Sequence, residues 1–100
     1  MNTSLQGRVA LVTGAGQGMG RAVAALLAEH GAAVAVNDIN ARTAQATVEA
    51  IRAAAGQAVA APGDVSQAGE VRAMVEQAAQ ALGAVDILVN NAAYMSMIDL

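Results

Sequence analysis

The sequence predicts an α/β fold in which a doubly wound parallel sheet is built from strands and helices in the order βαβαβαβ. Short apolar runs alternate with longer segments of helical periodicity, and Gly31, Gly56 and Gly83 end those segments at intervals of about one βα unit. The residues suited to ligand binding come directly after the strands, where ligands bind in such sheets. Right-handed crossovers then give an expected strand order of 3-2-1-4.

The first predicted element is the uninterrupted apolar run of residues 9–12, which is typical of a central parallel strand covered on both faces. Four glycines follow at alternate positions, and the apolar spacing becomes helical from Met19 onward. Glycine allows a sharp turn and a close approach to a bulky ligand. Because the turn leads into a helix N-terminus, its N–H groups favour an anion such as a pyrophosphate.

The next two elements are a helix and a strand. The apolar face expected for the first helix comprises Met19, Val23, Leu26, Leu27 and His30. Gly31 is expected to supply a left-handed C-terminal cap. Residues 32–36 form a second apolar run that ends in Asn37-Asp38.

Two further helices and strands complete the pattern. Asn40 is a good N-cap for a second helix, which stops at Gly56. Residues 58–61 form a third, weaker strand, and Ser66 is expected to cap the third helix. The apolar positions expected on these two helices are Ala44, Val48, Ile51 and Ala55, then Val71, Met74, Val75, Ala78 and Leu82. Residues 85–89 make the fourth strand, which runs into Asn90-Asn91-Ala92-Ala93.

Composition limits the partners. One hundred residues permit a single domain, residues 1–100, and a hydrophobic content of 56% can fill its core. A net charge of −3 with dispersed arginines argues against nucleic acid, and the absence of cysteine excludes disulfides and thiolate metal sites. No apolar run approaches the roughly 20 residues that cross a bilayer, and residues 1–4 lack the features of a signal peptide. We therefore expect no membrane partner, no metal and a cytoplasmic location.

The glycine spacing matches one motif and excludes two others. GxGxxG fails because Met19 and Arg21 stand where glycine is required, and a Walker A loop fails because the chain has no lysine. The pattern that fits is TGxxxGxG, formed by Thr13, Gly14, Gly18 and Gly20. With Asp38, Asp64-Val65 and Asn90-Asn91-Ala92-Ala93, it resembles the N-terminal, cofactor-binding part of the short-chain dehydrogenase/reductase family over residues 5–100. The resemblance implies a Rossmann-type fold.

The resemblance also implies site roles. The cofactor-binding residues expected around the turn are Gly14, Gly16, Gln17, Gly18, Met19 and Gly20. Asp38, eighteen residues after Gly20, would accept hydrogen bonds from ribose hydroxyls and repel a 2′-phosphate, which favours NAD over NADP. Asp64 and Val65 would border the adenine, although Asp64 beside Ser66 equally fits a helix-leading acid. Asn91 and Ala92 would place their backbone beside the cofactor, with Thr13 hydrogen-bonding toward them.

No catalytic residue is assigned. The family's chemistry depends on a Ser and a Tyr-x-x-x-Lys pair, whereas this chain has no lysine and its single tyrosine, Tyr94, has Ile98 four residues on. The family's C-terminal catalytic half is therefore absent, and the sheet is expected to be incomplete beyond its fourth strand.

The predicted function is the NAD-binding part of an oxidoreductase. Its full-length parent would transfer hydride between NAD(H) and a small alcohol or carbonyl substrate, and would form a homo-oligomer. Two alternatives remain at this point. One is an S-adenosylmethionine-dependent methyltransferase fragment, to which Gly14, Gly16, Gly18 and the acids after strands 2 and 3 are also suited. The other is a non-catalytic nucleotide-binding or regulatory module.

Overall fold

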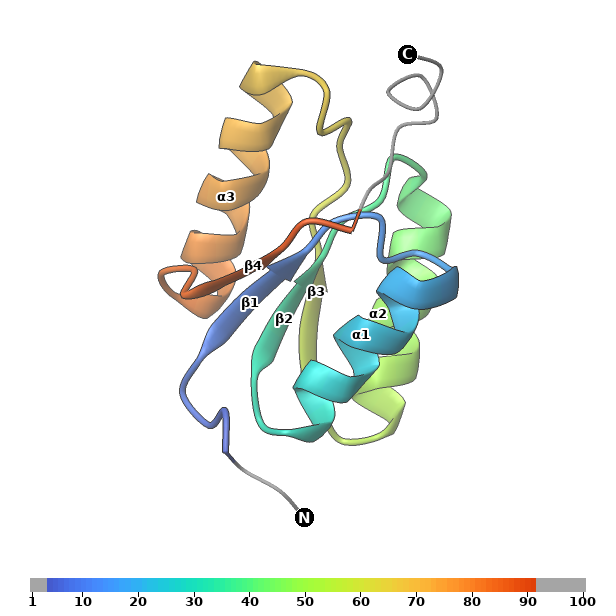
Figure 1. The fold of residues 1–100 in the computed structure, drawn as a ribbon, viewed down its shortest axis with the longest axis vertical. Helices are drawn as coiled ribbons and strands as arrows, with labels where there is room; N and C mark the ends of the chain where they lie inside the picture. Colours follow the sequence, from blue (N-terminus) through green and yellow to red (C-terminus); the bar gives the residue numbers. More distant parts are fainter. Residues whose placement is uncertain (1–3, 92–100) are drawn as a thin grey trace.

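The computed structural model describes residues 4–91 and has the predicted βαβαβαβ order (Figure 1). The elements in chain order are β1 (Val9–Val12), α1 (Gly18–Glu29), β2 (Ala33–Val36), α2 (Ala41–Ala53), β3 (Gln57–Ala60), α3 (Ala68–Leu82) and β4 (Ile87–Val89). The strands form one parallel sheet in the order β3-β2-β1-β4, which confirms the predicted topology. Each predicted strand lies within two residues of its observed position.

The sheet carries helices on both faces (Figure 1). Because successive side chains of a strand point to opposite faces, alternate residues separate into two cores. Val12, Val34 and Val36 belong to the core cluster that includes residues of α1 and α2. Leu11 and Ala35 instead pack in a second cluster with Met74 and Ala78 of α3. All eight residues of β1 and β2 are buried, as expected for central strands.

Helix α1 departs from the predicted apolar face. Met19 is 75% exposed and Leu26 is 53% exposed, whereas Val23 and Leu27 pack against the core as predicted. The buried residues of α1 are Gly20 and Ala24. Small residues at these positions let the helix axis approach the sheet closely, so the contact stripe follows the small residues and leaves the two larger side chains outside it.

The helix ends also differ in part from prediction. Asn40 caps α2 as predicted, its side chain accepting hydrogen bonds from the amides of Arg42 and Thr43. The N-cap of α3 is Gln67 and not Ser66, because Ser66 is held in a turn by Asp64. Gly31 has the expected positive φ of 103°. At the end of α2 the left-handed residue is Ala55, with φ 69°, one position before the glycine.

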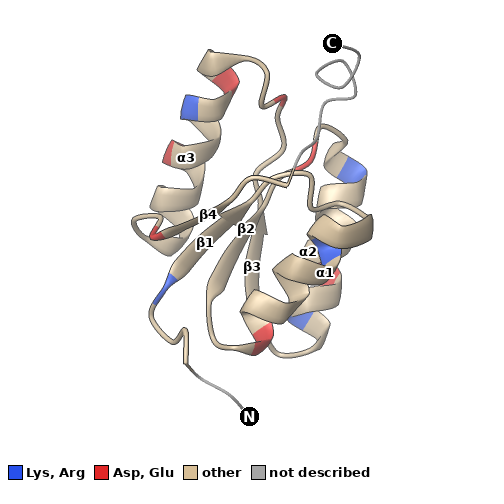
Figure 2. Ribbon diagram, viewed as in Figure 1, with Lys and Arg blue, Asp and Glu red and all other residues tan. Residues whose placement is uncertain are grey.

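Within residues 4–91, the charged residues lie outside the strands, on the helices and loops (Figure 2). Within residues 4–91, no helix combines the length and hydropathy that a membrane span requires. In the same part of the chain, His, Cys, Asp and Glu side chains form no group of three that could hold a metal ion.

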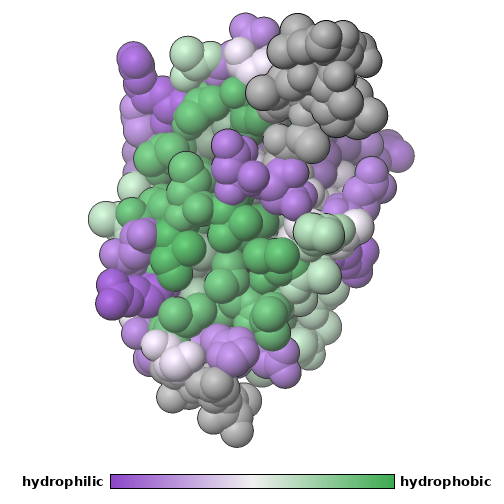
Figure 3. Space-filling view, viewed as in Figure 1, coloured by the Kyte–Doolittle hydropathy of each residue, from purple (hydrophilic) through white to green (hydrophobic). Residues whose placement is uncertain are grey.

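Strand β4 lies at one edge of the sheet and pairs with β1 on one side. Leu88, at its centre, is 64% exposed, and Val75 of α3 is 39% exposed. Figure 3 shows apolar surface gathered around β4 on this side of the molecule. Among the described strands, none covers the outer edge of β4.

Candidate functional site

The glycine turn, residues 13–20, comprises the loop between β1 and α1 and the first residues of α1, at the carboxyl end of the sheet. Gly14 and Gly18 have φ values of 60° and 61°, a left-handed conformation that glycine adopts without strain. A Cβ added to Gly18 would meet nothing within 4 Å. Helix α1 starts there, and its N-cap, Gln17, makes no side-chain capping bond. The turn therefore presents an exposed helix N-terminus, whose amides suit an anionic group.

Gly16 and Gly20 lie so close to other parts of the protein that a side chain would not fit at either position. A Cβ on Gly20 would collide with the carbonyl oxygen of Gly14 and lie 2.5 Å from Asn91 Nδ2. A Cβ on Gly16 would collide with the Thr43 hydroxyl and lie 2.7 Å from Asp38 Oδ2. Gly20 thus allows the start of α1 to pack against Gly14, and Gly16 allows the turn to lie directly against Asp38.

Asp38 follows β2 and its carboxylate is held at both oxygens. Oδ2 accepts a hydrogen bond from the Gly16 amide at 2.9 Å, and Oδ1 accepts one from the Asn40 amide at 3.1 Å. The residue is partly buried. The structure therefore brings together the predicted acid and the predicted glycine turn, which are 22 residues apart in the sequence.

Asn37, immediately before Asp38, was not among the predicted site residues. It is 1% exposed, and its Oδ1 accepts a hydrogen bond from the Gly14 amide at 3.4 Å. Its Nδ2 donates to the carbonyls of Ala61 and Gly63 at 3.0 and 3.1 Å. One buried amide therefore joins the glycine turn to the segment after β3. The sequence feature that could have indicated Asn37 is the position of its side-chain amide directly after the four buried apolar residues of β2.

The end of β4 reaches the same turn. The Asn91 side chain donates to the Gly14 carbonyl at 3.2 Å, and its amide donates to the Thr13 hydroxyl at 2.9 Å. Thr13 in turn donates to Asn90 Oδ1 at 3.2 Å. These bonds join β1 to β4 as the resemblance implied for Thr13. Ala92 lies outside the described residues.

Asp64 lies in the loop after β3, and its described contacts are local. Oδ1 accepts hydrogen bonds from the amide and the hydroxyl of Ser66 at 2.9 and 2.7 Å, and these bonds lower the pKa of the carboxyl. Its amide donates to Glu70 Oε1 at 2.8 Å. The Val65 side chain packs beside the α3 core. The loop nonetheless starts beside the site, since the Gly63 amide donates to the Asp38 carbonyl at 3.1 Å.

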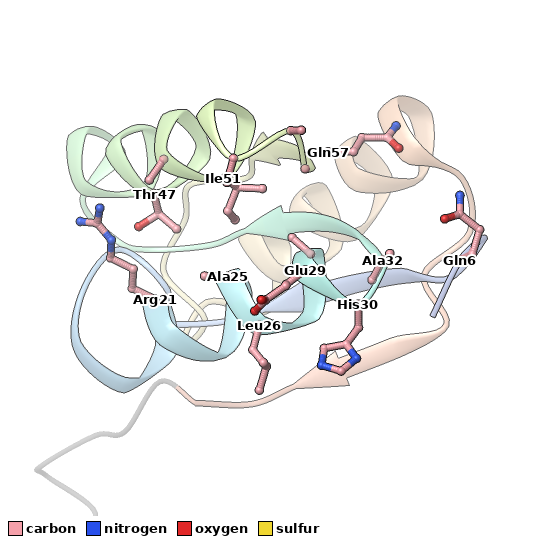
Figure 4. Close-up of a pocket in the computed structure, with 16 residues that line it drawn as sticks. Gln6, Arg21, Ala25, Leu26, Glu29, His30, Ala32, Thr47, Ile51 and Gln57 are labelled. Carbon is pink, nitrogen blue, oxygen red and sulfur yellow. The ribbon is translucent and has the colours of Figure 1, made fainter. Parts of the chain in front are cut away.

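A groove of about 860 Å³ lies between α1 and α2 (Figure 4). Arg21 and Thr47 are at one end, and Gln6 and Gln57 are at the other (Figure 4). None of the predicted cofactor-binding residues lines this groove. The predicted site is therefore a separate surface along the carboxyl edge of the sheet.

Comparisons with known proteins identify the family of the chain. The family model described as short chain dehydrogenase matches residues 8–99. An uncharacterized oxidoreductase of Methylorubrum extorquens is 52% identical over 90 residues, which cover 89% of this chain and 36% of that protein. The 7alpha-hydroxysteroid dehydrogenase of Escherichia coli K12 is 45% identical over 91 residues, covering 91% of this chain and 36% of that protein.

A solved structure gives the same picture. The crystal structure of hydroxysteroid dehydrogenase from Escherichia coli superposes with a TM-score of 0.87 at 44% identity, covering 90% of this chain and 38% of that one. The chain thus spans little more than a third of the length of these relatives. The matches favour an oxidoreductase over the methyltransferase and regulatory-module alternatives. The chain belongs to the short-chain dehydrogenase/reductase family.

Proposed function

We propose that these residues form the NAD-binding part of an oxidoreductase that acts on an alcohol or carbonyl substrate. The observation that carries the proposal is the position of Asp38, whose Oδ2 lies 2.9 Å from the Gly16 amide inside the glycine turn. A carboxylate fixed beside an exposed helix N-terminus provides acceptors for ribose hydroxyls next to donors for a pyrophosphate.

The pyrophosphate would lie against the turn and the start of α1. The residues proposed to contact it are Gly14, Gly16, Gln17, Gly18, Met19 and Gly20. The fit is supported by the open space at Gly18, by the exposure of residues 17–19, and by the absence of a side-chain cap on α1. The dinucleotide would supply hydride exchange at its nicotinamide ring, and the role of this chain is to bind and orient it.

NAD is proposed over NADP because of the charge at the ribose position. The Asp38 carboxylate would repel a 2′-phosphate on the adenosine ribose. The residues adjacent to it in the sequence, Asn37 and Ile39, are uncharged, as are residues 15–17 of the turn. The described hydrogen bonds of Asp38 both come from backbone amides, so its negative charge is not neutralised by a cation in these contacts.

The rest of the dinucleotide is assigned to two further segments. Asp64 and Val65 are proposed to border the adenine, because the loop that carries them begins at Gly63 beside Asn37 and Asp38. Asn91, held against Gly14 and Thr13, is proposed to place its backbone beside the cofactor, with Ala92 following it.

The whole protein's activity is proposed from the family. Relatives include a 7alpha-hydroxysteroid dehydrogenase and a cyclohexanol dehydrogenase, both named for alcohols. The Tyr-x-x-x-Lys pair of the family is not within these 100 residues, which contain no lysine. We therefore propose that this chain alone binds the dinucleotide without turnover, and that the full-length protein is a cytoplasmic homo-oligomer.

Calorimetric titration of the folded chain with NAD⁺ and with NADP⁺ tests the proposal. NAD⁺ should bind at least about tenfold more tightly, since a hydrogen bond to a charged group contributes about 1.5–3 kcal/mol. Asp38→Asn should narrow this ratio because it removes the charge that repels the phosphate. Asp64→Asn is the matched control and should leave the ratio unchanged. Equal affinities for the two dinucleotides, or no binding by a demonstrably folded chain, would contradict the proposal.

A further inference from the structure

Thr47 places a buried hydroxyl against the glycine turn. It lies within α2, is 1% exposed, and points into the space between α2 and α1 (Figure 4). Its Oγ1 is 2.9 Å from the Ala15 carbonyl oxygen and 3.3 Å from that of Gly16, residues more than 30 positions earlier in the chain. Thr47 thus contacts two successive carbonyls of the turn from outside it.

These contacts fix the orientation of two peptide planes. In a trans peptide the C=O and the following N–H point in opposite directions, and the described residues contain no cis peptide. With the Ala15 carbonyl drawn toward Thr47, the Gly16 amide faces the other way, where it donates to Asp38 Oδ2 at 2.9 Å. With the Gly16 carbonyl also drawn toward Thr47, the Gln17 amide is directed away from α2.

The buried Ala15 side chain packs in the core, and the Ala15 amide donates to the Asn37 carbonyl at 2.6 Å, but neither contact involves the carbonyls of Ala15 and Gly16. Gly16 has no side chain to pack, and the space that a Cβ would fill is taken by Thr43 and Asp38. Asn37 and Asn91 bond the peptide groups of Gly14, one step earlier. Among the side-chain hydrogen bonds described, those from Thr47 are the ones that reach the Ala15 and Gly16 carbonyls.

Burial of the hydroxyl also needs a reason. Thr47 lies on the face of α2 that carries Ala44, Val48 and Ile51, all of them buried apolar residues. An unpaired hydroxyl there would destabilise the fold, whereas the hydrogen bonds of Thr47 to the turn offset the cost of removing its hydroxyl from water. No buried side-chain polar atom among the described residues lacks a partner.

We infer that Thr47 is a positioning residue for the dinucleotide site. Its hydroxyl holds the Ala15–Gly16 peptide so that the Gly16 amide orients the Asp38 carboxylate. The role of Thr47 in orienting the turn rests on the hydrogen-bond geometry alone. Its effect on dinucleotide affinity rests on the proposed function of Asp38.

The test compares Thr47→Val with Thr47→Ser in the 100-residue chain. Valine keeps the shape and removes the hydroxyl, and serine keeps the hydroxyl and removes the methyl group. Loss of one hydrogen bond of ordinary strength predicts about threefold to tenfold faster hydrogen exchange at the Gly16 amide and an NAD⁺ affinity lowered by a similar factor. Thr47→Ser should restore both quantities toward wild type.

Val48→Ala separates this effect from general loosening. Val48 is fully buried in the same helix, so the variant lowers the melting temperature by creating a cavity, with the turn's hydrogen bonds intact. It should leave Gly16 exchange, measured well below melting, and NAD⁺ affinity near wild type.

Two results would overturn the inference. Unchanged Gly16 exchange in Thr47→Val would show that the hydroxyl does not orient the turn, whether or not NAD⁺ binds. Faster exchange with unchanged NAD⁺ affinity would break the link from Thr47 to the dinucleotide. A wild-type chain that binds no NAD⁺ contradicts the proposed function, and the exchange result then still decides the positioning role.

Discussion

The two ends of the parallel sheet are held together in different ways. At the carboxyl end, the backbone of residues 14–16 is hydrogen-bonded by side chains from α2 and from the segments after β2 and β4. At the amino end, α1 and α2 finish with bonds between backbone groups close in sequence, such as Gly31 N to Ala28 O and Gly56 N to Ile51 O, although the start of β1 is bonded by a side chain, Asp86 Oδ2 accepting from the Val9 amide at 2.9 Å. We therefore expect a substitution around the glycine turn to alter the geometry of the site, and one at the ends of α1 and α2 to alter stability alone.

The largest expected effect is at Gly20, where the carboxyl end is most crowded. Gly20→Ala places a methyl group against the Gly14 carbonyl and the Asn91 side chain. Overpacking of this kind should lower the free energy of unfolding by about 3 kcal/mol, measured by urea denaturation, and should weaken NAD⁺ binding as well.

Gly69→Ala is the matched control for Gly20. A Cβ on Gly69 meets nothing within 4 Å, and the residue lies in α3. Alanine should therefore raise the free energy of unfolding by up to about 1 kcal/mol through helix propensity. If the two substitutions changed stability alike, the crowding at Gly20 would not be real.

A smaller effect, of opposite sign, is expected at the amino end. Ala55 has φ 69°, which strains a residue that carries a Cβ. Ala55→Gly should raise the free energy of unfolding by about 1 kcal/mol and leave NAD⁺ affinity unchanged. The neighbouring Ala54 has φ −91°, so Ala54→Gly relieves no strain and should not stabilise. A change in NAD⁺ affinity in Ala55→Gly would break the distinction between the two ends.

The smallest expected effect on stability concerns Asp64, which lies in the loop after β3 at the carboxyl end of the sheet. Ser66 lowers the pKa of Asp64 below its ordinary value of 3.8. A carboxyl whose pKa is lower in the folded state stabilises that state above its unfolded pKa, and the contribution disappears as the pH falls through the folded pKa. The stability difference between wild type and Asp64→Asn should therefore shrink as the pH falls below about 4.

Urea denaturation between pH 3 and 7 measures this difference. Ser66→Ala, which removes the hydroxyl donor, should show the same convergence with wild type at low pH. A difference that stays constant across the range would mean that the Asp64 contacts do not contribute to folding.

Sequence patterns predicted the topology because they record local physics. Apolar runs and terminal glycines set the order of elements, and the asparagine before α2 set its cap. The phase of α1 was partly wrong because small residues, and not Met19 or Leu26, determine which face meets the sheet. The cap predicted at Ser66 was wrong because Asp64 competes for that residue.

Most of the candidate site could be proposed from sequence, and two residues could not. Asn37 and Thr47 bond the glycine turn across 23 and more than 30 residues. The position of Asn37 directly after a strand was a signal of the site, but neither this amide nor a threonine at an apolar helix position identifies its distant partners in the sequence. Their contribution exists only once α2 and the end of β2 are packed against the turn.

The strand order has a consequence for how the chain folds. The β1–β4 pairing aligns Ala10 with Ile87, and Asn91 bonds Thr13 and Gly14 from the far end of the described chain. Contacts between residues so distant in sequence form slowly, because a long loop must close first. During synthesis, the turn after β1 emerges from the ribosome long before Asn91 does. We therefore expect the glycine turn, the first part of the proposed dinucleotide site to be synthesised, to be among the last segments to acquire its native geometry.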